Sequence, residues 1–150
     1  MDGSVIFAAL LALVVGSTAL GFAARRRNGR LRELRPGVLR VRSHELTGDD
    51  GAEPRFGRSA TLVQFSTETC ARCPATRRML GELASGRDGV THVDVDITRR
   101  KDLADRFSIL QTPTILLLDA TGIARARIGG APQRAVVATE LDRLIGEPHA

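Results

Sequence analysis

Two cysteines separated by two residues carry the clearest chemical signal in this chain. Cys70 and Cys73 are its only cysteines, and Pro74 follows them directly. A strand-like apolar run, residues 61–65, comes just before the pair. A Cys-x-x-Cys motif between a strand and a helix is typical of a redox site, and positions i and i+3 of a helix share a face. We expect Cys70 near the helix N-terminus, where unpaired N–H groups favour its thiolate.

Other uses of the cysteine pair fit the sequence less well. A disulfide that closes so short a loop would remove little entropy from the unfolded chain, which disfavours a purely structural role. A zinc site needs four ligands, and His44, His92 and His149 lack zinc-finger spacing. We therefore predict no metal site. Delivery of copper through the two thiolates stays open as an alternative, although no Met-rich segment surrounds them.

An apolar N-terminal segment predicts a membrane anchor. Residues 4–24 contain no charged side chain, and their number is about that needed to span a bilayer as a helix. A cleaved signal peptide would carry Lys or Arg ahead of the apolar stretch, and this chain has none there. We therefore expect an uncleaved anchor, then a basic juxtamembrane segment and linker over residues 25–58, and a folded domain over residues 59–146.

The distribution of charge predicts how the anchor is oriented. Six arginines follow the span, opposed only by Glu33: Arg25, Arg26, Arg27, Arg30, Arg32 and Arg35. The positive-inside rule places this side of a single-pass protein, and with it the folded domain, in the cytoplasm. An extracytoplasmic domain is the alternative, and it would resemble the anchored proteins of envelope thiol metabolism.

The same distribution favours lipid over nucleic acid as a partner. The whole net charge of +5 lies in residues 1–46, because residues 47–150 hold fourteen basic and fourteen acidic side chains. A basic segment beside a membrane span suits a contact with anionic lipid headgroups. The absence of Tyr and Trp removes most base-stacking contacts, so we predict no nucleic-acid partner.

Hydrophobic periodicity from Ser59 onward predicts an α/β domain. Apolar alternation or apolar runs predict strands over residues 61–65, 92–97, 114–118 and 123–128. Helical spacing predicts a helix after the cysteines that ends near Gly86, a short helix around residues 103–107, and a last helix over residues 137–145. An earlier strand is expected near residues 38–42, and residues 43–58 are typical of a loop or linker.

Four motifs in this order resemble those of the thioredoxin family. Residues 62–65 lead to the cysteine pair, residues 93–96 match the family's middle strand, residues 111–114 stand where the family keeps a cis-proline, and residues 128–130 precede the last helix. The resemblance covers residues 59–145. It implies the thioredoxin fold, a central mixed β-sheet flanked by helices, here with an N-terminal transmembrane helix.

The resemblance also implies a reaction and a binding surface. Cys70 would attack a substrate disulfide, Cys73 would resolve the mixed disulfide, and Pro113 would lie beside them. The backbone of Thr112 would pair with an extended protein or peptide substrate, and Gly129 would leave room for that segment. The redox-active Cys70–Cys73 disulfide implies no bound cofactor, and a reductant that the sequence does not name would recycle it.

Several positions depart from the family pattern. Thr69 replaces the usual tryptophan, and Arg72 lies inside the motif, where we expect it to favour the Cys70 thiolate and to contact substrate. Gln64 replaces the family's buried acid, and we align His92 with that acid's lysine partner. We expect Gln64 and a neutral His92 to form a hydrogen-bonded pair, with His92 taking the proton of Cys73. A purely structural His92 stays open as well.

Taken together, these features predict a membrane-anchored thiol–disulfide oxidoreductase. An alternative from another functional class is a module that binds or assembles a client protein at the membrane, in which redox activity is incidental.

Overall fold

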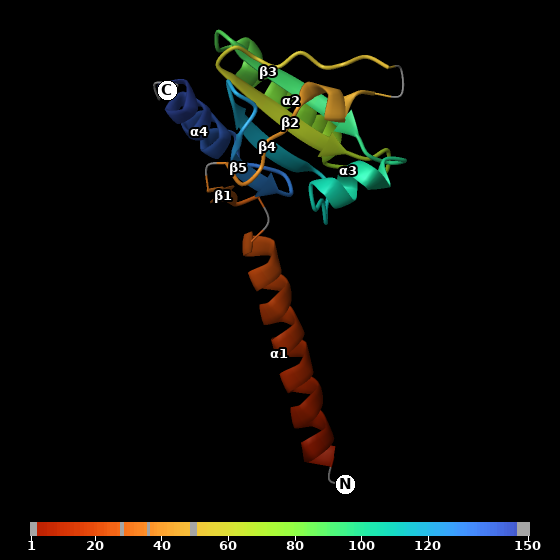
Figure 1. Cartoon of the computed structure of the whole chain (residues 1–150). Coiled ribbons are helices and arrows are strands. Elements are labelled where there is room, and N and C mark those ends of the chain that lie inside the picture. The colour runs from red at the N-terminus through yellow and green to blue at the C-terminus, as the bar shows by residue number, and fades with distance from the viewer. Residues whose placement is uncertain (1–2, 28, 36, 49–50, 147–150) are drawn as a thin grey trace.

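The computed structural model describes residues 3–27, 29–35, 37–48 and 51–146, and within them a long helix precedes an α/β domain (Figure 1). The elements in chain order are α1 (Gly3–Arg27), β1 (Leu31–Glu33), the 3-10 helix η1 (Ser43–Leu46), β2 (Ala60–Ser66), α2 (Cys73–Ser85), β3 (Val90–Asp96), α3 (Lys101–Arg106), β4 (Thr114–Asp119), β5 (Ala124–Gly129) and α4 (Arg134–Gly146).

The strands form one mixed five-stranded sheet in the order β1-β5-β4-β2-β3. β2 pairs with β3 in parallel, and every other neighbouring pair is antiparallel. Every residue of β2 and β4 is buried, because these central strands are covered on both faces of the sheet. The strand that delivers the cysteines is therefore held by two neighbours and two apolar layers.

Two apolar clusters fill the space on either side of the sheet. On one face, α2 and α4 pack through Leu80, Leu83, Val137 and Leu141. On the other face, α3 and the segment around η1 pack through a second set: Val41, Leu46, Leu103 and Phe107. Figure 1 shows α3 and α4 on opposite sides of the sheet. This arrangement confirms the thioredoxin fold expected from the sequence.

The N-terminal helix confirms the expected long apolar segment. Residues 3–23 of α1 are exposed, and Gly3–Ala23 form a 21-residue stretch with a mean hydropathy of 2.4. A soluble protein rarely leaves so much contiguous apolar surface uncovered. This length and hydropathy make α1 a candidate transmembrane span.

The first strand lies earlier than expected. β1 occupies Leu31–Glu33 and pairs with β5, whereas the segment expected as a strand, residues 38–42, makes a single bridge between Arg40 and Ile123. The side chains explain the difference: Leu31 and Leu34 pack into the clusters on the two faces of the sheet, whereas Val38 is 70% exposed. A first strand thus does precede the domain, but at residues 31–33 and not at residues 38–42.

Candidate active site

The turn between β2 and α2 presents the two cysteines with different exposure. Cys70 and Cys73 form a disulfide with their Cα atoms 5.4 Å apart. The helix begins at Cys73, so Cys70 lies in the turn before α2 and not on its first turn, and the Cys73 N–H donates to the Cys70 carbonyl over 3.1 Å. Cys73 is 2% exposed, while Cys70 is half-buried. Of the two sulfurs, the one at Cys70 is therefore the one open to a substrate.

A shallow groove of about 380 Å³ runs past the disulfide. Its lining is polar apart from one alanine and one glycine: Thr67, Thr69, Cys70, Ala71, Arg72, Gln111, Thr112 and Gly130. The hydroxyls of Thr67 and Thr112 lie 3.2 Å apart and join the two walls. Arg72 and Thr112 lie next to the cysteines in this groove, as the sequence predicted. That Thr67 and Gln111 also line it was not predicted.

The proline loop presents an unpaired backbone to this groove. The Thr112–Pro113 peptide bond is cis, and Pro113 is buried. Within the described residues, neither the N–H nor the C=O of Thr112 makes a hydrogen bond, and the first ladder pair of β4 begins at Thr114. This short stretch can therefore accept one extended segment by backbone pairing.

Gly129 does not have the open face that the sequence led us to expect. A Cβ built on it would lie 2.6 Å from Nε2 of Gln111, so that side chain already fills the space above it. Gly130, and not Gly129, lines the groove. The long, exposed side chain of Gln111 must move before a substrate can approach Gly129, which only the folded loop could reveal.

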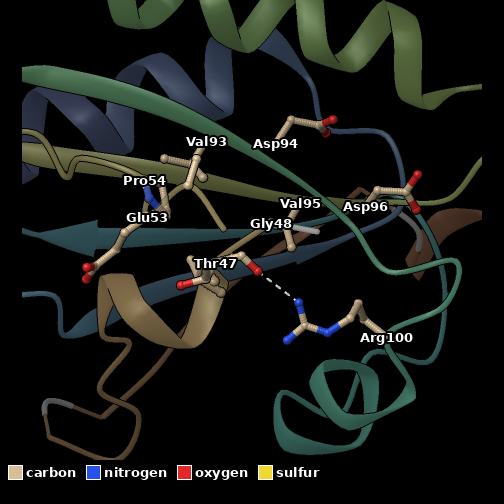
Figure 2. Close-up of a pocket in the computed structure, with 11 residues that line it drawn as sticks. Thr47, Gly48, Glu53, Pro54, Val93, Asp94, Val95, Asp96 and Arg100 are labelled. Carbon is tan, nitrogen blue, oxygen red and sulfur yellow. Dashed lines mark hydrogen bonds between the residues drawn. The ribbon is translucent and has the colours of Figure 1, made fainter. Parts of the chain in front are cut away.

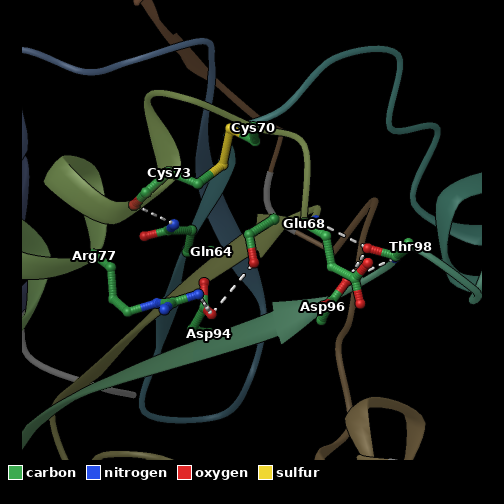
Figure 3. A network of polar contacts seen from close by, with 9 residues as sticks. Gln64, Glu68, Cys70, Cys73, Arg77, Asp94, Asp96 and Thr98 are labelled. Atoms are coloured by element: carbon green, nitrogen blue, oxygen red, sulfur yellow. Dashed lines mark hydrogen bonds and ion pairs between the residues drawn. A yellow bond between two sulfur atoms is a disulfide. The ribbon is translucent and has the colours of Figure 1, made fainter.

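Beneath the disulfide, Gln64 supports the start of α2. Its side chain is fully buried on β2, and Nε2 donates to the Cys73 carbonyl over 3.1 Å (Figure 3). Its other polar atom, Oε1, has no hydrogen-bond partner among the described residues. Gln64 therefore holds the backbone of the resolving cysteine and leaves one buried acceptor open.

The neighbour of Gln64 on the next strand is Asp94, and not His92 as we expected. In the parallel register of β2 and β3, Gln64 pairs with Asp94 and Leu62 pairs with His92. The expected Gln64–His92 hydrogen bond is absent, since Oε1 of Gln64 and Nε2 of His92 both lack partners among the described residues. A histidine two residues from Asp94 lies about 7 Å further along the strand.

Asp94 is held on the same face as Gln64 by two neighbours. Its Oδ2 accepts from the Ser66 hydroxyl over 3.2 Å and forms an ion pair with Arg77 of α2 (Figure 3). Its Oδ1 is buried and accepts no hydrogen bond from the described residues. Sequence reasoning missed Asp94, although a signal was present: Gln64 and Asp94 each lie two residues before the end of a strand, and these parallel strands end level.

His92 lies in a less polar place than Asp94. Desolvation by burial lowers its pKa below the ordinary value, the nearby Asp94 carboxylate raises it, and Arg77 lowers it. A Cβ on Gly81 of α2 would lie 4.0 Å from Nδ1 of His92, which places the ring under that helix. The structure thus keeps His92 neutral at neutral pH, and its part in proton transfer stays a prediction.

The loop before Cys70 is tied to the end of β3. The Glu68 N–H donates to the Thr98 hydroxyl over 3.0 Å, and that hydroxyl donates to the Asp96 carboxylate (Figure 3). Hydrogen bonds from the Thr98 hydroxyl and backbone N–H lower the pKa of Asp96. These bonds fix the approach of the chain to Cys70.

A second hollow, of about 360 Å³, lies away from the disulfide at the outer edge of β3. Figure 2 shows it between β3 and the loop around Thr47 and Pro54, with Arg100 donating to the Thr47 carbonyl over 2.9 Å. Asp94 is one of the residues that line this hollow, but its carboxylate pairs with Arg77 of α2, which lies on the opposite face of the sheet from the hollow. In the described residues, no group of three or more His, Cys, Asp or Glu side chains could hold a metal ion.

Comparison with known proteins agrees with this geometry. Residues 56–143 match the family model described as Thioredoxin, which is more than half of the chain. Thioredoxin C-2 of Corynebacterium nephridii is 33% identical over 85 residues, which cover 56% of this chain and 78% of that protein.

Solved structures show the same fold at lower identity. Chloroplastic thioredoxin z superposes with a TM-score of 0.53 at 21% identity, over 60% of this chain and 81% of that one. A mutant thioredoxin from Halobacterium salinarum NRC-1 gives a TM-score of 0.55 at 12% identity, over 74% of this chain and 91% of that one. The matched region holds the disulfide, the groove and the proline loop, which together support thiol–disulfide redox chemistry. The chain belongs to the thioredoxin family.

Proposed function

We propose that this protein is a membrane-anchored thiol–disulfide oxidoreductase that reduces or exchanges disulfides in proteins or peptides. The observation that carries the proposal is the unequal exposure of the two cysteines. Cys70 opens onto the groove, whereas Cys73 is 2% exposed and lies beneath it. An attacking sulfur has to be accessible, and a resolving sulfur has only to reach its neighbour.

The reaction proceeds by two thiol–disulfide exchanges. In the reduced protein, the Cys70 thiolate attacks one sulfur of the substrate disulfide, and the other substrate sulfur leaves as a thiolate. The Cys73 thiolate then attacks Cys70 in the mixed disulfide and releases the second substrate thiolate. The substrate gains two electrons, and the Cys70–Cys73 disulfide forms again. A thiol reductant must return two electrons to the protein before the next turnover.

Asp94 is a candidate for the group that takes the proton of Cys73, because it is the neighbour of Gln64 on the next strand. Gln64 cannot titrate, but its open acceptor Oε1 and the open Oδ1 of Asp94 belong to neighbouring residues in register. His92, further along β3, is the competing base. The pH dependence of substrate reduction by Asp94→Asn and His92→Gln distinguishes the two bases.

The groove favours an extended polar substrate. Thr112 offers its free N–H and C=O to a strand-like segment, and the walls carry hydroxyl and amide groups instead of the bulky aromatic that is usual in the family. The exposed Arg72 favours acidic residues near the substrate cysteine.

The membrane anchor and its orientation rest on α1 and on the charges that follow it. The 21-residue apolar stretch is long enough to cross a bilayer, and the arginine cluster after it favours a cytoplasmic domain. An impermeant thiol reagent tests the side, because the two cysteines are the only thiols in the chain. Labelling of reduced Cys70 in intact cells would place the domain outside.

The enzymatic proposal is tested by trapping. Cys73→Ser expressed in cells should hold substrates as mixed disulfides through Cys70, and Cys70→Ser is the matched control that should hold none. Retained biological function in Cys70→Ser would favour a client-binding module. Tight stoichiometric binding of Cu(I) by the reduced protein, without disulfide reduction, would favour metal delivery.

A further inference from the structure

The membrane anchor joins the domain at the active-site end of the sheet. α1 ends at Arg27, and two residues later the Gly29 N–H donates to the Gly129 carbonyl over 2.7 Å. Gly129 is the last residue of β5, and Gly130 lines the catalytic groove. The chain thus leaves the candidate span and reaches the edge of the groove almost at once, and Figure 1 shows β1 next to β5 where α1 meets the domain.

A second backbone hydrogen bond links the end of β5 to the proline loop, residues 112 and 113. The Gly130 N–H donates to the Pro113 carbonyl over 2.8 Å. Pro113 follows Thr112, which lines the groove and whose backbone has no hydrogen-bond partner among the described residues. From Gly29 to Pro113 there are therefore only two backbone hydrogen bonds and one peptide link.

The point at which the chain enters the sheet, at Gly29, is held tightly against the domain. Gly29 has a φ of +77°, and a Cβ built on it would lie 2.5 Å from the Ala131 carbonyl oxygen, so the chain packs closely against the loop after β5. Leu31 pairs with Ile128 and packs into the cluster beneath α4. From Gly29 onward the chain is therefore hydrogen-bonded and packed against the domain, and it adds no flexible linker there.

The largest possible distance between the groove and the end of the apolar span follows from the number of residues between them. The candidate span ends at Ala23, and the four helical residues up to Arg27 add about 6 Å. Two further residues add at most about 7 Å before Gly29. The groove therefore lies within about 20 Å of the end of the apolar span, once about 7 Å is allowed from Gly29 to Gly130. Arg25, Arg26 and Arg27 lie in the interval that corresponds to the headgroups.

We propose that the substrates are disulfides of membrane proteins that lie close to the bilayer surface. This inference rests on the proposed function, because it presumes that α1 spans the membrane and that the dithiol is active. A connection of so few residues confines the groove to a thin layer above the lipid. Disulfides in that layer meet Cys70 at high effective concentration, and disulfides far above it meet the groove only when the whole domain or the substrate bends.

The test is a molecular ruler in vesicles. The full-length protein is reconstituted in phosphatidylcholine vesicles with some anionic phosphatidylglycerol, together with single-span peptides that carry a disulfide on a rigid helical extension. The disulfide stands either about 9 Å or about 45 Å above the span, as set by about six or thirty helical residues. We expect the near disulfide to be reduced at least about tenfold faster than the far one.

A variant with a longer linker shows whether the preference for the near disulfide depends on the length of the connection or on the reactivity of the peptides. Insertion of about twenty Gly and Ser residues after Arg27 adds a flexible reach of about 25 Å and should bring the two rates within about threefold of each other. The same insert appended after Ala150 is the matched control and should keep the wild-type preference. Equal rates for near and far disulfides in the wild type, or an unchanged preference after the insertion at Arg27, would overturn the inference.

Reduction of insulin, a soluble substrate, and flotation with the vesicles monitor the proposed function separately. Both should be the same for wild type and linker variants. Intact insulin reduction and flotation with no height preference would refute only the inference about substrates. Loss of insulin reduction or of flotation in the wild type would refute the proposed function, and the inference with it.

Discussion

Replacing Gln64 by Glu tests the pairing of Gln64 with Asp94. The substitution keeps the size of a fully buried side chain and places a carboxyl group beside that of Asp94 on the neighbouring strand. Adjacent strands lie about 4.8 Å apart, and two like charges at that distance repel by about 3 kcal/mol at an effective dielectric constant of about 20. This repulsion, together with burial, raises the pKa of the carboxyl group that the substitution introduces.

The sign of the pH dependence follows from that raised pKa. The folded variant holds a proton that the unfolded chain has already lost, so its stability relative to wild type is highest below the ordinary pKa of a glutamate and falls as the pH rises through the raised value. Arg77 is partly exposed and pairs with Asp94, so it offsets some of the repulsion. At pH 8 we expect a loss of about 2 kcal/mol, or a fall in Tm of about 8 °C, and little loss near pH 4.

Far-ultraviolet circular dichroism of the oxidised protein in non-ionic detergent measures this effect, since the chain has no tryptophan for fluorescence. The double variant with Asp94→Asn should recover most of the loss at pH 8, whereas the double variant with His92→Gln should not. A coupling below about 0.5 kcal/mol with Asp94, or a larger coupling with His92, would contradict the register argument.

Three further results are expected. After reduction, Cys73→Ser should be alkylated at Cys70 at least about tenfold faster than Cys70→Ser is alkylated at Cys73, because only Cys70 is accessible; similar rates would contradict the assignment. Wild type should lose stability as the pH falls through about 6.5, because the lowered pKa of His92 disfavours its charged form in the folded state; superimposable pH profiles of Tm for wild type and His92→Gln would refute this. Gly29→Ala should cost about 2 kcal/mol, because its left-handed backbone is strained for alanine and its Cβ would meet a backbone oxygen. Gly37→Ala, with a similar φ of +83° and open space around it, is the control and should cost about 1 kcal/mol; equal losses in chemical denaturation would show that Gly29 is not packed tightly.

Most elements of the domain could be predicted from the chain itself. The runs at residues 61–65 and 114–118 are strands because their apolar and β-branched residues suit a position covered on both faces. The helix after the cysteines ends at Ser85 with Gly86 as its C-cap, in agreement with the expected end near Gly86. The redox chemistry was predictable for a local reason: a Cys-x-x-Cys pair at the start of a helix needs only four consecutive residues to form.

The surroundings of the dithiol required the tertiary structure. Whether Asp94 or His92 lies beside Gln64 depends on the register of two strands about thirty residues apart, and in a parallel pair no hairpin turn sets that register. Two other contacts at the site also involve residues that are distant in sequence. The Gln111 side chain lies above Gly129, and the Gly29 N–H donates to the Gly129 carbonyl, which brings the anchor to the groove. Sequence periodicity reports which face of an element is apolar, and it carries no information on which distant residue will be its neighbour, because packing of the whole domain selects that partner.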